Sequence, residues 1–379
     1  MTKSKTGNNK FLKAYNEAGI LDLIRMGKAI SRADLSKATG LSPTAAGAIV
    51  SSLIEKGYIH EVGTGESKGG RKPVLLELKP DSYYSIGRDV DVDGISSVLI
   101  DITGKTLYKG ASKLTSIAPE DVISAAENCV RQIIKEFSIQ PSRLLGVGVS
   151  VPGMVDPSTY RVVLAPNLGW EDIDLVSMLE EKLKLPIYIE NEAMASAICE
   201  NWLGACQSAN NFVCVNIKSG IGAGIFTGGK LYRGTSGSAG EVGHIVVDEN
   251  GPRCGCGNYG CLETIASTSG IVNKARRMVR QGVVSSLNEI ADVDQIGFDE
   301  IVQAARNDDE MAKGLLNDAA RYLGIALSSL VNTLNPSRIV LGKDFAKYGD
   351  LVMPTLRSIV DGKALKRPAQ NVEIIISEI

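Results

Sequence analysis

Three cysteines and a histidine near the middle of the chain have the residue types and spacing of a metal site. Cys254, Cys256 and Cys261 lie within eight residues, and His244, one of only two histidines, precedes them. Three thiolates and one imidazole make a set that Zn²⁺ binds tetrahedrally, and spacing this tight leaves little room for an open coordination position. Soft ligands in a reducing compartment favour zinc. We therefore predict a structural zinc; the alternative is a group of unligated buried cysteines.

A second set of chemically distinctive residues is basic and lies near the N-terminus. Residues 1–80 contain 13 Lys and Arg against 7 Asp and Glu, a net charge of +6, so the remaining 299 residues carry −8. This asymmetry is typical of a head that binds nucleic acid. The glycines of segment 63–73 allow a close approach to DNA, which predicts Arg71 in the minor groove. Lys68 and Lys72 are expected at phosphates.

The elements that must position these basic residues read as three helices followed by two strands. Ser31 is expected to cap the second helix and Ser42 the third. The turn between them has helix-turn-helix spacing, and strands at 58–62 and 74–78 add a wing. The first residues of the third helix would face base edges in the major groove. The residues expected at DNA are Arg32, Ser42, Thr44, Ala45, Lys68, Arg71 and Lys72. The alternative is a winged module that binds protein.

Beyond residue 80 the pattern changes to strands that alternate with helices, which indicates an α/β fold. Helices are expected at 119–137 and 192–203, and the chain after 262 reads as mostly helical. Strands are expected at 84–90, 95–102, 106–114, 145–151, 186–190, 212–217, 222–226, 338–341 and 372–376.

Composition and length exclude several classes of protein. A hydrophobic fraction of 44 % over 379 residues is enough for a sizeable core, which excludes wholesale disorder. No apolar run reaches the roughly 18–20 residues of a membrane span, and the N-terminus lacks the apolar region of a secretion signal. Seven cysteines, an odd number, fit a reducing compartment better than a disulfide framework. We therefore expect a cytoplasmic protein with no membrane partner.

Several of these segments together resemble the ROK family, which comprises repressors, open reading frames and sugar kinases. The segments that carry the resemblance are Glu241–His244, Cys254–Glu263, Pro152–Asp156, Ala165–Leu168 and Glu190–Ala193. With the winged head and Ser67–Pro73, the chain is most similar to members of the xylose-repressor type. The resemblance spans nearly the whole chain, and the cysteine string is highly specific.

The resemblance implies a fold: a winged helix-turn-helix followed by a two-lobed, actin-like sugar kinase fold of the ribonuclease-H type. The expected domains are a DNA-binding head at 1–80, a first α/β lobe at 81–190 and a second lobe with the zinc loop at 191–379. The end of the chain is expected to return to the first lobe.

The resemblance also implies a sugar site in the cleft between the lobes. The implied sugar-binding residues are Asn167, Asn191, Glu192, Glu241, His244 and Glu263. Carboxylates and amides suit a polyhydroxylated ring, because they supply both donors and acceptors. His244 could bind zinc through one ring nitrogen and a sugar hydroxyl through the other, so that zinc fixes the orientation of the ring.

The segments that hold ATP in the kinases are altered here. Val and Asp in segment 88–94 replace the Gly-Gly-Thr of the first phosphate loop, and extra carboxylates there would repel a triphosphate. The adenosine-side Gly-Gly is broken at 341–344, whereas the Gly-rich turn 219–224 is retained. Glu192 stands where the kinases have an aspartate base. We therefore expect no catalytic residues and no kinase activity.

The sequence as a whole predicts a transcriptional repressor of carbohydrate-utilisation genes that responds to xylose or a related aldose. A homodimer or a dimer of dimers would present paired heads to a pseudo-palindromic operator. Sugar binding would close the cleft and change operator affinity. The alternatives are an ATP-dependent sugar kinase of the ROK type and a sugar-binding regulator that acts through protein contacts.

Overall fold

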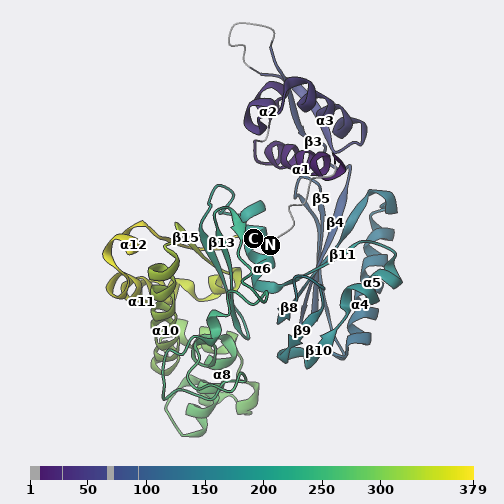
Figure 1. Cartoon of the computed structure of the whole chain (residues 1–379). Helices are drawn as coiled ribbons and strands as arrows, with labels where there is room; N and C mark the ends of the chain where they lie inside the picture. The colour runs from purple at the N-terminus through teal and green to yellow at the C-terminus, as the bar shows by residue number, and fades with distance from the viewer. Residues whose placement is uncertain (1–8, 28, 66–71, 93) are drawn as a thin grey trace, which may run out of the picture. The chain divides into compact units, whose positions relative to one another are not determined.

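The computed structural model describes residues 9–27, 29–65, 72–92 and 94–379 (Figure 1). The chain forms two compact units: Met1–Val149 with Leu175–Tyr188, and Ser150–Asp174 with Ile189–Ile379. The chain therefore passes between the units three times. The expected head and most of the expected first lobe fall in one unit, and the finer division into three domains stays a prediction.

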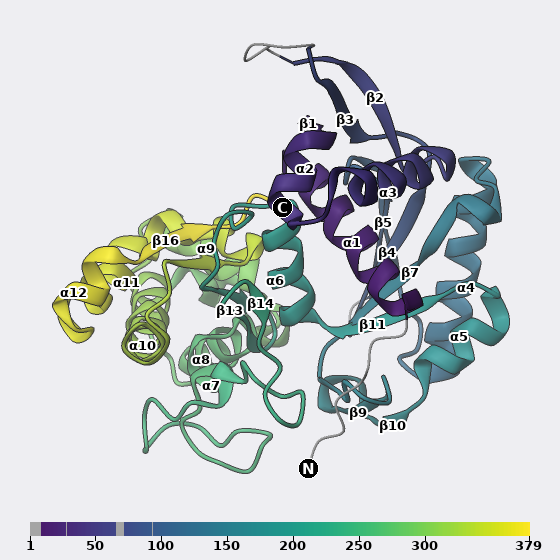
Figure 2. The ribbon, with the colours of Figure 1, turned by 45° about the horizontal axis from the view of Figure 1, so that its top comes forward.

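The head consists of three helices and a three-stranded sheet of order β1-β3-β2. Ser31 and Ser42 cap the second and third helices as predicted, with side chains that accept from the N–H groups of Asp34 and Ala45. The β2–β3 pair extends beyond α2 and α3 (Figure 2). Apolar residues from all three helices and from β2 and β3 form one core. The elements are α1 (Asn9–Gly27), β1 (Ile30–Ser31), α2 (Arg32–Thr39), α3 (Pro43–Glu55), β2 (Ile59–Thr64) and β3 (Val74–Leu78).

A five-stranded sheet of order β11-β7-β4-β5-β6 forms the rest of the first unit. Its middle strands alternate buried and mostly half-buried residues because one antiparallel face packs against helices. Helices α4 and α5 lie side by side on the same side of this sheet (Figure 1). The elements are β4 (Tyr84–Asp91), β5 (Gly94–Asp101), β6 (Thr106–Lys113), α4 (Pro119–Glu136), β7 (Leu144–Val151), α5 (Leu175–Leu183) and β11 (Ile187–Asn191).

The second unit is built on a sheet of order β14-β13-β12-β15-β16. Every residue of β12 is buried, as expected for a central strand covered on both faces. Gly222 and Gly224 allow α6 to approach the sheet, since a Cβ at Gly224 would lie 2.4 Å from the Cβ of Ala197. The retained Gly-rich turn therefore serves helix packing. The elements are α6 (Glu192–Trp202), β12 (Phe212–Ile217), β13 (Ile221–Thr227), β14 (Lys230–Leu231), β15 (Arg338–Leu341) and β16 (Glu373–Ile376).

Helices cover this second sheet, and a small additional sheet completes the unit. The long helix α10 packs along α11 and against α7, α8 and α9. The additional sheet, of order β10-β9-β8, contains the fully buried Trp170, which makes that tryptophan a core residue. No helix among the described residues is long and apolar enough to span a membrane. The elements are β8 (Met154–Val155), β9 (Val162–Ala165), β10 (Trp170–Ile173), α7 (Leu262–Ala266), α8 (Thr268–Arg280), α9 (Phe298–Arg306), α10 (Glu310–Leu334), α11 (Gly349–Lys363) and α12 (Lys366–Asn371).

Candidate functional site

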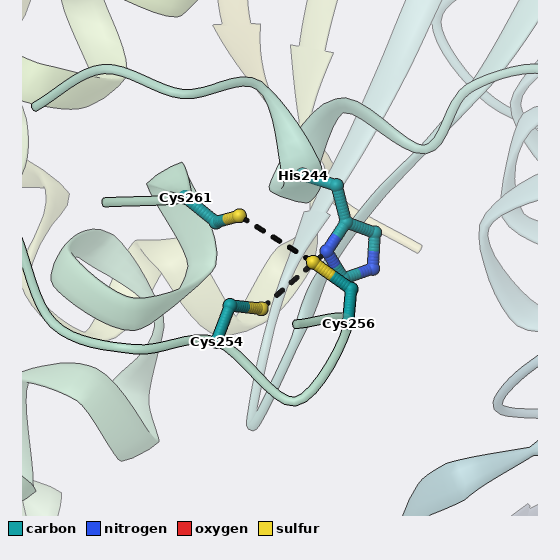
Figure 3. Close-up of side chains that lie close together, drawn as sticks. All are labelled: His244, Cys254, Cys256 and Cys261. Atoms are coloured by element: carbon teal, nitrogen blue, oxygen red, sulfur yellow. Dashed lines mark hydrogen bonds between the residues drawn. The ribbon is translucent and has the colours of Figure 1, made fainter. Parts of the chain in front are cut away.

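The four predicted zinc ligands come together on a tightly folded loop of the second unit (Figure 3). His244 ends the short helix η3 (Val242–His244), and Cys261 immediately precedes α7. Between them the loop folds back on itself, because the N–H of Cys254 donates to the carbonyl of Asn258 at 2.7 Å. Gly260 has a φ of +66°, and a Cβ there would overlap the carbonyl oxygen of Asp248. This close contact requires glycine.

The distances between the ligand atoms fit a tetrahedral zinc. Four Zn bonds of about 2.1–2.3 Å place neighbouring ligand atoms roughly 3.5–3.8 Å apart. Cys256 Sγ lies 3.7 Å from Cys261 Sγ, and Cys254 Sγ lies 3.6 Å from His244 Nδ1. All four atoms lie within 4.8 Å of one another. The donor set and its spacing therefore suit Zn²⁺, whose binding here remains a prediction.

The thiols of this cluster differ in their protonation because their surroundings differ. A backbone hydrogen bond at Asn258 lowers the pKa of the exposed Cys256 to about 7. Burial raises the pKa of Cys254 above its ordinary value and that of Cys261 to about 12. Protein ligands must be deprotonated to bind a metal, so Cys256 is the thiol that loses its proton first.

Two of the predicted sugar-binding carboxylates lie beside this cluster. His244 turns Nδ1 toward Cys254, while its Nε2 lies 3.9 Å from Glu241 Oε2. Glu263, on α7, accepts a hydrogen bond from the N–H of Ile221 at 3.2 Å. The pKa of Glu241 is raised, chiefly because the surrounding protein removes part of its hydration. His244 therefore has one ring nitrogen at the cysteines and the other beside a carboxylate.

Asn191 and Glu192 stand at the start of α6, where their roles differ. The Asn191 side-chain oxygen caps the helix by accepting from the N–H groups of Ala193 and Met194, and its Nδ2 donates to the carbonyl of Gly153 at 2.7 Å. Asn191 therefore positions the helix and has one remaining N–H for a ligand. The side chain of Glu192 forms an ion pair instead, with its Oε2 atom 3.4 Å from Lys218 Nζ.

Lys218 and Arg233 are charged residues that form ion pairs next to Asn191 in sequence, with Glu192 and Glu190, and the sequence analysis did not single them out. Lys218 pairs with Glu192, and its carbonyl accepts from the N–H of Thr268. Arg233 pairs with Glu190 at 2.5 Å, and Glu190 directly precedes Asn191 in the sequence. The available signals were the position of Lys218 immediately before the Gly-rich turn and the position of Glu190 inside the family-like segment 190–193.

Asn167 is exposed on the short helix η2 (Pro166–Leu168) of the same unit. This segment follows β9, which lies against the turn at Gly153: a Cβ on Gly153 would lie 2.3 Å from the carbonyl oxygen of Leu164. The bond from Asn191 to Gly153 thus connects α6 to the hairpin that carries Asn167. All six predicted sugar-binding residues belong to the second unit, and their assignment to sugar stays a prediction.

The predicted DNA-binding residues lie in three places. Ser42, Thr44 and Ala45 are exposed at the N-terminus of α3. Arg32 begins α2 and pairs with Glu61 of β2 at 2.8 Å. Lys72 is exposed just before β3, whereas Lys68 and Arg71 lie outside the described residues.

The segments that differ from the kinase pattern in sequence, 88–94 and 341–344, lie in different units. Arg88 is buried in the sheet of the first unit and donates to Ser97 Oγ. In the second unit, Gly342 and Asp344 of the altered segment 341–344 line a cavity of about 210 Å³. Ligand pockets usually measure about 300–1,000 Å³. The cavity is lined by Ser196, Asn216, Ile217, Lys218, Gly342, Asp344 and Ile379.

The winged head, the α/β body and the Cys/His cluster are the features that the ROK resemblance implied, and comparison with models of known families identifies that same family. The model of the ROK family matches residues 85–378, and the chain belongs to this family. The family predicted from the sequence is thereby confirmed.

Relatives and solved structures identify the branch to which the chain is similar. It is 33 % identical to the xylose repressor of Caldicellulosiruptor bescii over 374 residues, which cover 98 % of this chain and 94 % of the relative. A crystal structure of a ROK family transcriptional regulator, a homologue of the E. coli MLC protein, matches with a TM-score of 0.85 and 28 % identity, over 97 % of this chain and 92 % of the other.

A ROK glucokinase from Streptomyces griseus, solved with glucose and AMPPNP, matches with a TM-score of 0.68 and 28 % identity. The match covers 78 % of this chain and 94 % of the glucokinase. The predicted fold class, a winged helix-turn-helix with a ROK kinase-like α/β body, is confirmed.

Proposed function

We propose that the protein is a sugar-responsive transcriptional repressor of carbohydrate-utilisation genes. One observation carries the proposal: a winged head with an exposed recognition-helix N-terminus and a ROK sugar-site body occur in one chain. A relative named a xylose repressor and a solved structure named a transcriptional regulator match along nearly the whole chain. The effector is an aldose, and the named xylose repressor makes xylose the first sugar to test.

The sugar site combines groups of complementary chemistry. Glu241, Glu263 and Nε2 of His244 provide acceptors and a donor beside the zinc loop. Zinc, when bound, supplies a fixed positive centre that holds His244 and the two flanking segments in place. Asn191 orients α6, so that Glu192 is presented at a defined position.

The winged head would bind DNA through the N-terminus of α3 and the segment before β3. Thr44 and Ala45 would reach base edges, with Ala45 offering a methyl group to thymine. Ser42 contributes mainly as a cap, since its hydroxyl oxygen accepts from the N–H of Ala45. Lys68, Arg71 and Lys72 supply phosphate and minor-groove contacts, and two heads in a homodimer or a dimer of dimers bind two half-sites.

Kinase activity is not part of the proposed function. Glu192 is paired with Lys218, and the cavity at the second ATP segment is below the usual size of a ligand pocket. Arg88, the first residue of the altered segment 88–94, is buried in the sheet of the first unit.

The proposal is tested by titrating the full chain against duplexes from the DNA upstream of its own gene, with a panel of aldoses. A specific duplex is expected to bind at about 10⁻⁸–10⁻¹¹ M, and one aldose is expected to release it. Absence of duplex binding at low salt with every sugar would contradict the proposal. ATP-dependent phosphorylation of the same sugars would instead support the kinase alternative.

A further inference from the structure

The segment between the head and the following sheet is short and hydrogen-bonded within itself. β3 ends at Leu78 and β4 begins at Tyr84, which leaves residues 79–83. Ser82 Oγ donates to the carbonyl of Lys79 at 2.7 Å, and the Tyr84 hydroxyl donates to the carbonyl of Asp81 at 3.0 Å. The segment therefore differs from a flexible Gly/Ser linker and can transmit displacement.

Tyr83, the last residue of this segment, contacts structure on both sides. Its carbonyl accepts from the N–H of Ile102 at 2.9 Å, directly after β5. Its ring stacks on Tyr58 with centroids 4.5 Å apart, and its hydroxyl donates to the carbonyl of Lys56 at 2.8 Å. Lys56 is the C-cap of α3. One side chain thus holds the end of the recognition helix, while its backbone belongs to the sheet.

A tilt of α3 about its C-terminal end would move its N-terminus. A 13-residue helix is about 20 Å long, so a tilt of roughly 10° displaces its N-terminus by about 3 Å. That displacement is comparable to the length of a hydrogen bond. Thr44 and Ala45, at the N-terminus, would therefore gain or lose their base contacts with a small movement at Tyr83.

The sheet that holds the Tyr83 backbone also leads toward the sugar site. In the order β11-β7-β4-β5-β6, β4 follows directly after Tyr83 and β11 lies two places away. β11 ends at Asn191, and α6 begins at Glu192, two of the residues assigned to sugar. Three neighbouring strands of this sheet therefore lie between Tyr83 and the predicted sugar-binding residue Asn191.

We propose that Tyr83, stacked on Tyr58, is the positioning residue through which sugar binding reorients α3 and changes operator affinity. This inference rests on the proposed repressor function. It assigns to the Tyr83 side chain the coupling between the two ligands, while neither the sugar site nor the DNA-reading surface depends on it directly.

The test uses the full chain with Tyr83→Ala, and Tyr15→Ala as the matched control. Tyr15 is a tyrosine of α1 with 70 % exposure. Operator affinity is measured with and without saturating sugar, and sugar affinity is measured on the free protein. We expect Tyr83→Ala to keep both single-ligand affinities within about threefold, while the sugar-induced change in operator affinity falls from the 5–150-fold typical of allosteric coupling to below about twofold. Tyr15→Ala keeps the wild-type change.

Two further variants make the outcome decisive. Tyr58→Ala removes the other half of the stack and is expected to abolish the sugar response in the same way, whereas Tyr83→Phe keeps the stack and should retain part of it. A full response in both alanine variants overturns the inference. If both single-ligand affinities weaken while the ratio of operator affinities with and without sugar stays unchanged, Tyr83 has a purely structural role. This outcome also overturns the inference. If the wild-type chain itself shows no sugar response, the proposed function fails instead.

Discussion

The loop around the predicted zinc ligands is held by backbone hydrogen bonds of its own. Backbone hydrogen bonds join Cys254 to Asn258 and Gly257 to Cys254, and an isolated β-bridge joins Val246 to Cys261. Preorganised ligands favour binding, because less conformational freedom is lost when the metal enters. The loop therefore sets the positions of His244 and the carboxylates beside it.

Replacing one zinc ligand should remove the metal. We expect Cys256→Ser to lower the zinc content from about one ion per chain to a small fraction, since serine is a poor ligand for Zn²⁺. Elemental analysis of purified protein measures this directly, with Cys129→Ser as a control outside the cluster. Full zinc occupancy in Cys256→Ser would show that the four residues do not form the metal site.

Glu263 should matter for sugar more than for zinc. Glu263→Gln removes a charged acceptor, and hydrogen bonds to charged groups contribute about 1.5–3 kcal/mol, so sugar affinity is expected to fall roughly 10- to 150-fold. Calorimetry measures the affinity, and elemental analysis should show unchanged zinc. Glu249→Gln, an exposed carboxylate in the same loop, is the matched control. Equal sugar affinities in the two variants would remove Glu263 from the sugar site.

At the scale of elements, the cap of the recognition helix links local sequence to DNA binding. Ser42 caps α3 through the N–H of Ala45, and losing such a cap costs about 0.5–2 kcal/mol. We expect Ser42→Ala to speed hydrogen exchange of α3 amides roughly 2- to 30-fold, measured by mass spectrometry. Ser51→Ala, an exposed serine within the same helix, is the control and should not speed exchange. Identical exchange in the two variants would refute the capping role.

Elements with a strong local pattern could be predicted from the sequence. Ser31 and Ser42 predict where their helices begin, and the apolar run at 212–217 predicts a buried strand. The strands β8, β9 and β10 were not predicted, because each has only two to four residues and shows no clear alternation. Helix α5 was also missed.

Contacts between distant residues could not be predicted in the same way. The pairing of Lys218 with Glu192 depends on how α6 packs on β12 and β13, which no local pattern reveals. Likewise, the family resemblance implied Asn191 as a sugar ligand, but its capping of α6 and its bond to Gly153 appear only in the folded chain. The cysteine cluster was predictable because its ligands are close in sequence and chemically distinctive.

At the scale of the whole molecule, the chain crosses between the two units three times. One crossing lies within β7, and another lies within β11 just before Asn191. A ligand that prefers one arrangement of the units must shift the population toward it by its differential affinity. Within the first unit, residues 79–83 join the winged head to the five-stranded sheet.

The most direct test of the repressor function is reciprocity between the two ligands. Sugar is titrated by calorimetry into the free protein and into its complex with operator DNA, at one fixed salt concentration. Linkage requires the operator to weaken sugar binding by the same factor by which sugar weakens operator binding, typically 5- to 150-fold. We expect these two factors to agree. Equal sugar affinity with and without operator, although both ligands bind, would contradict sugar-controlled repression.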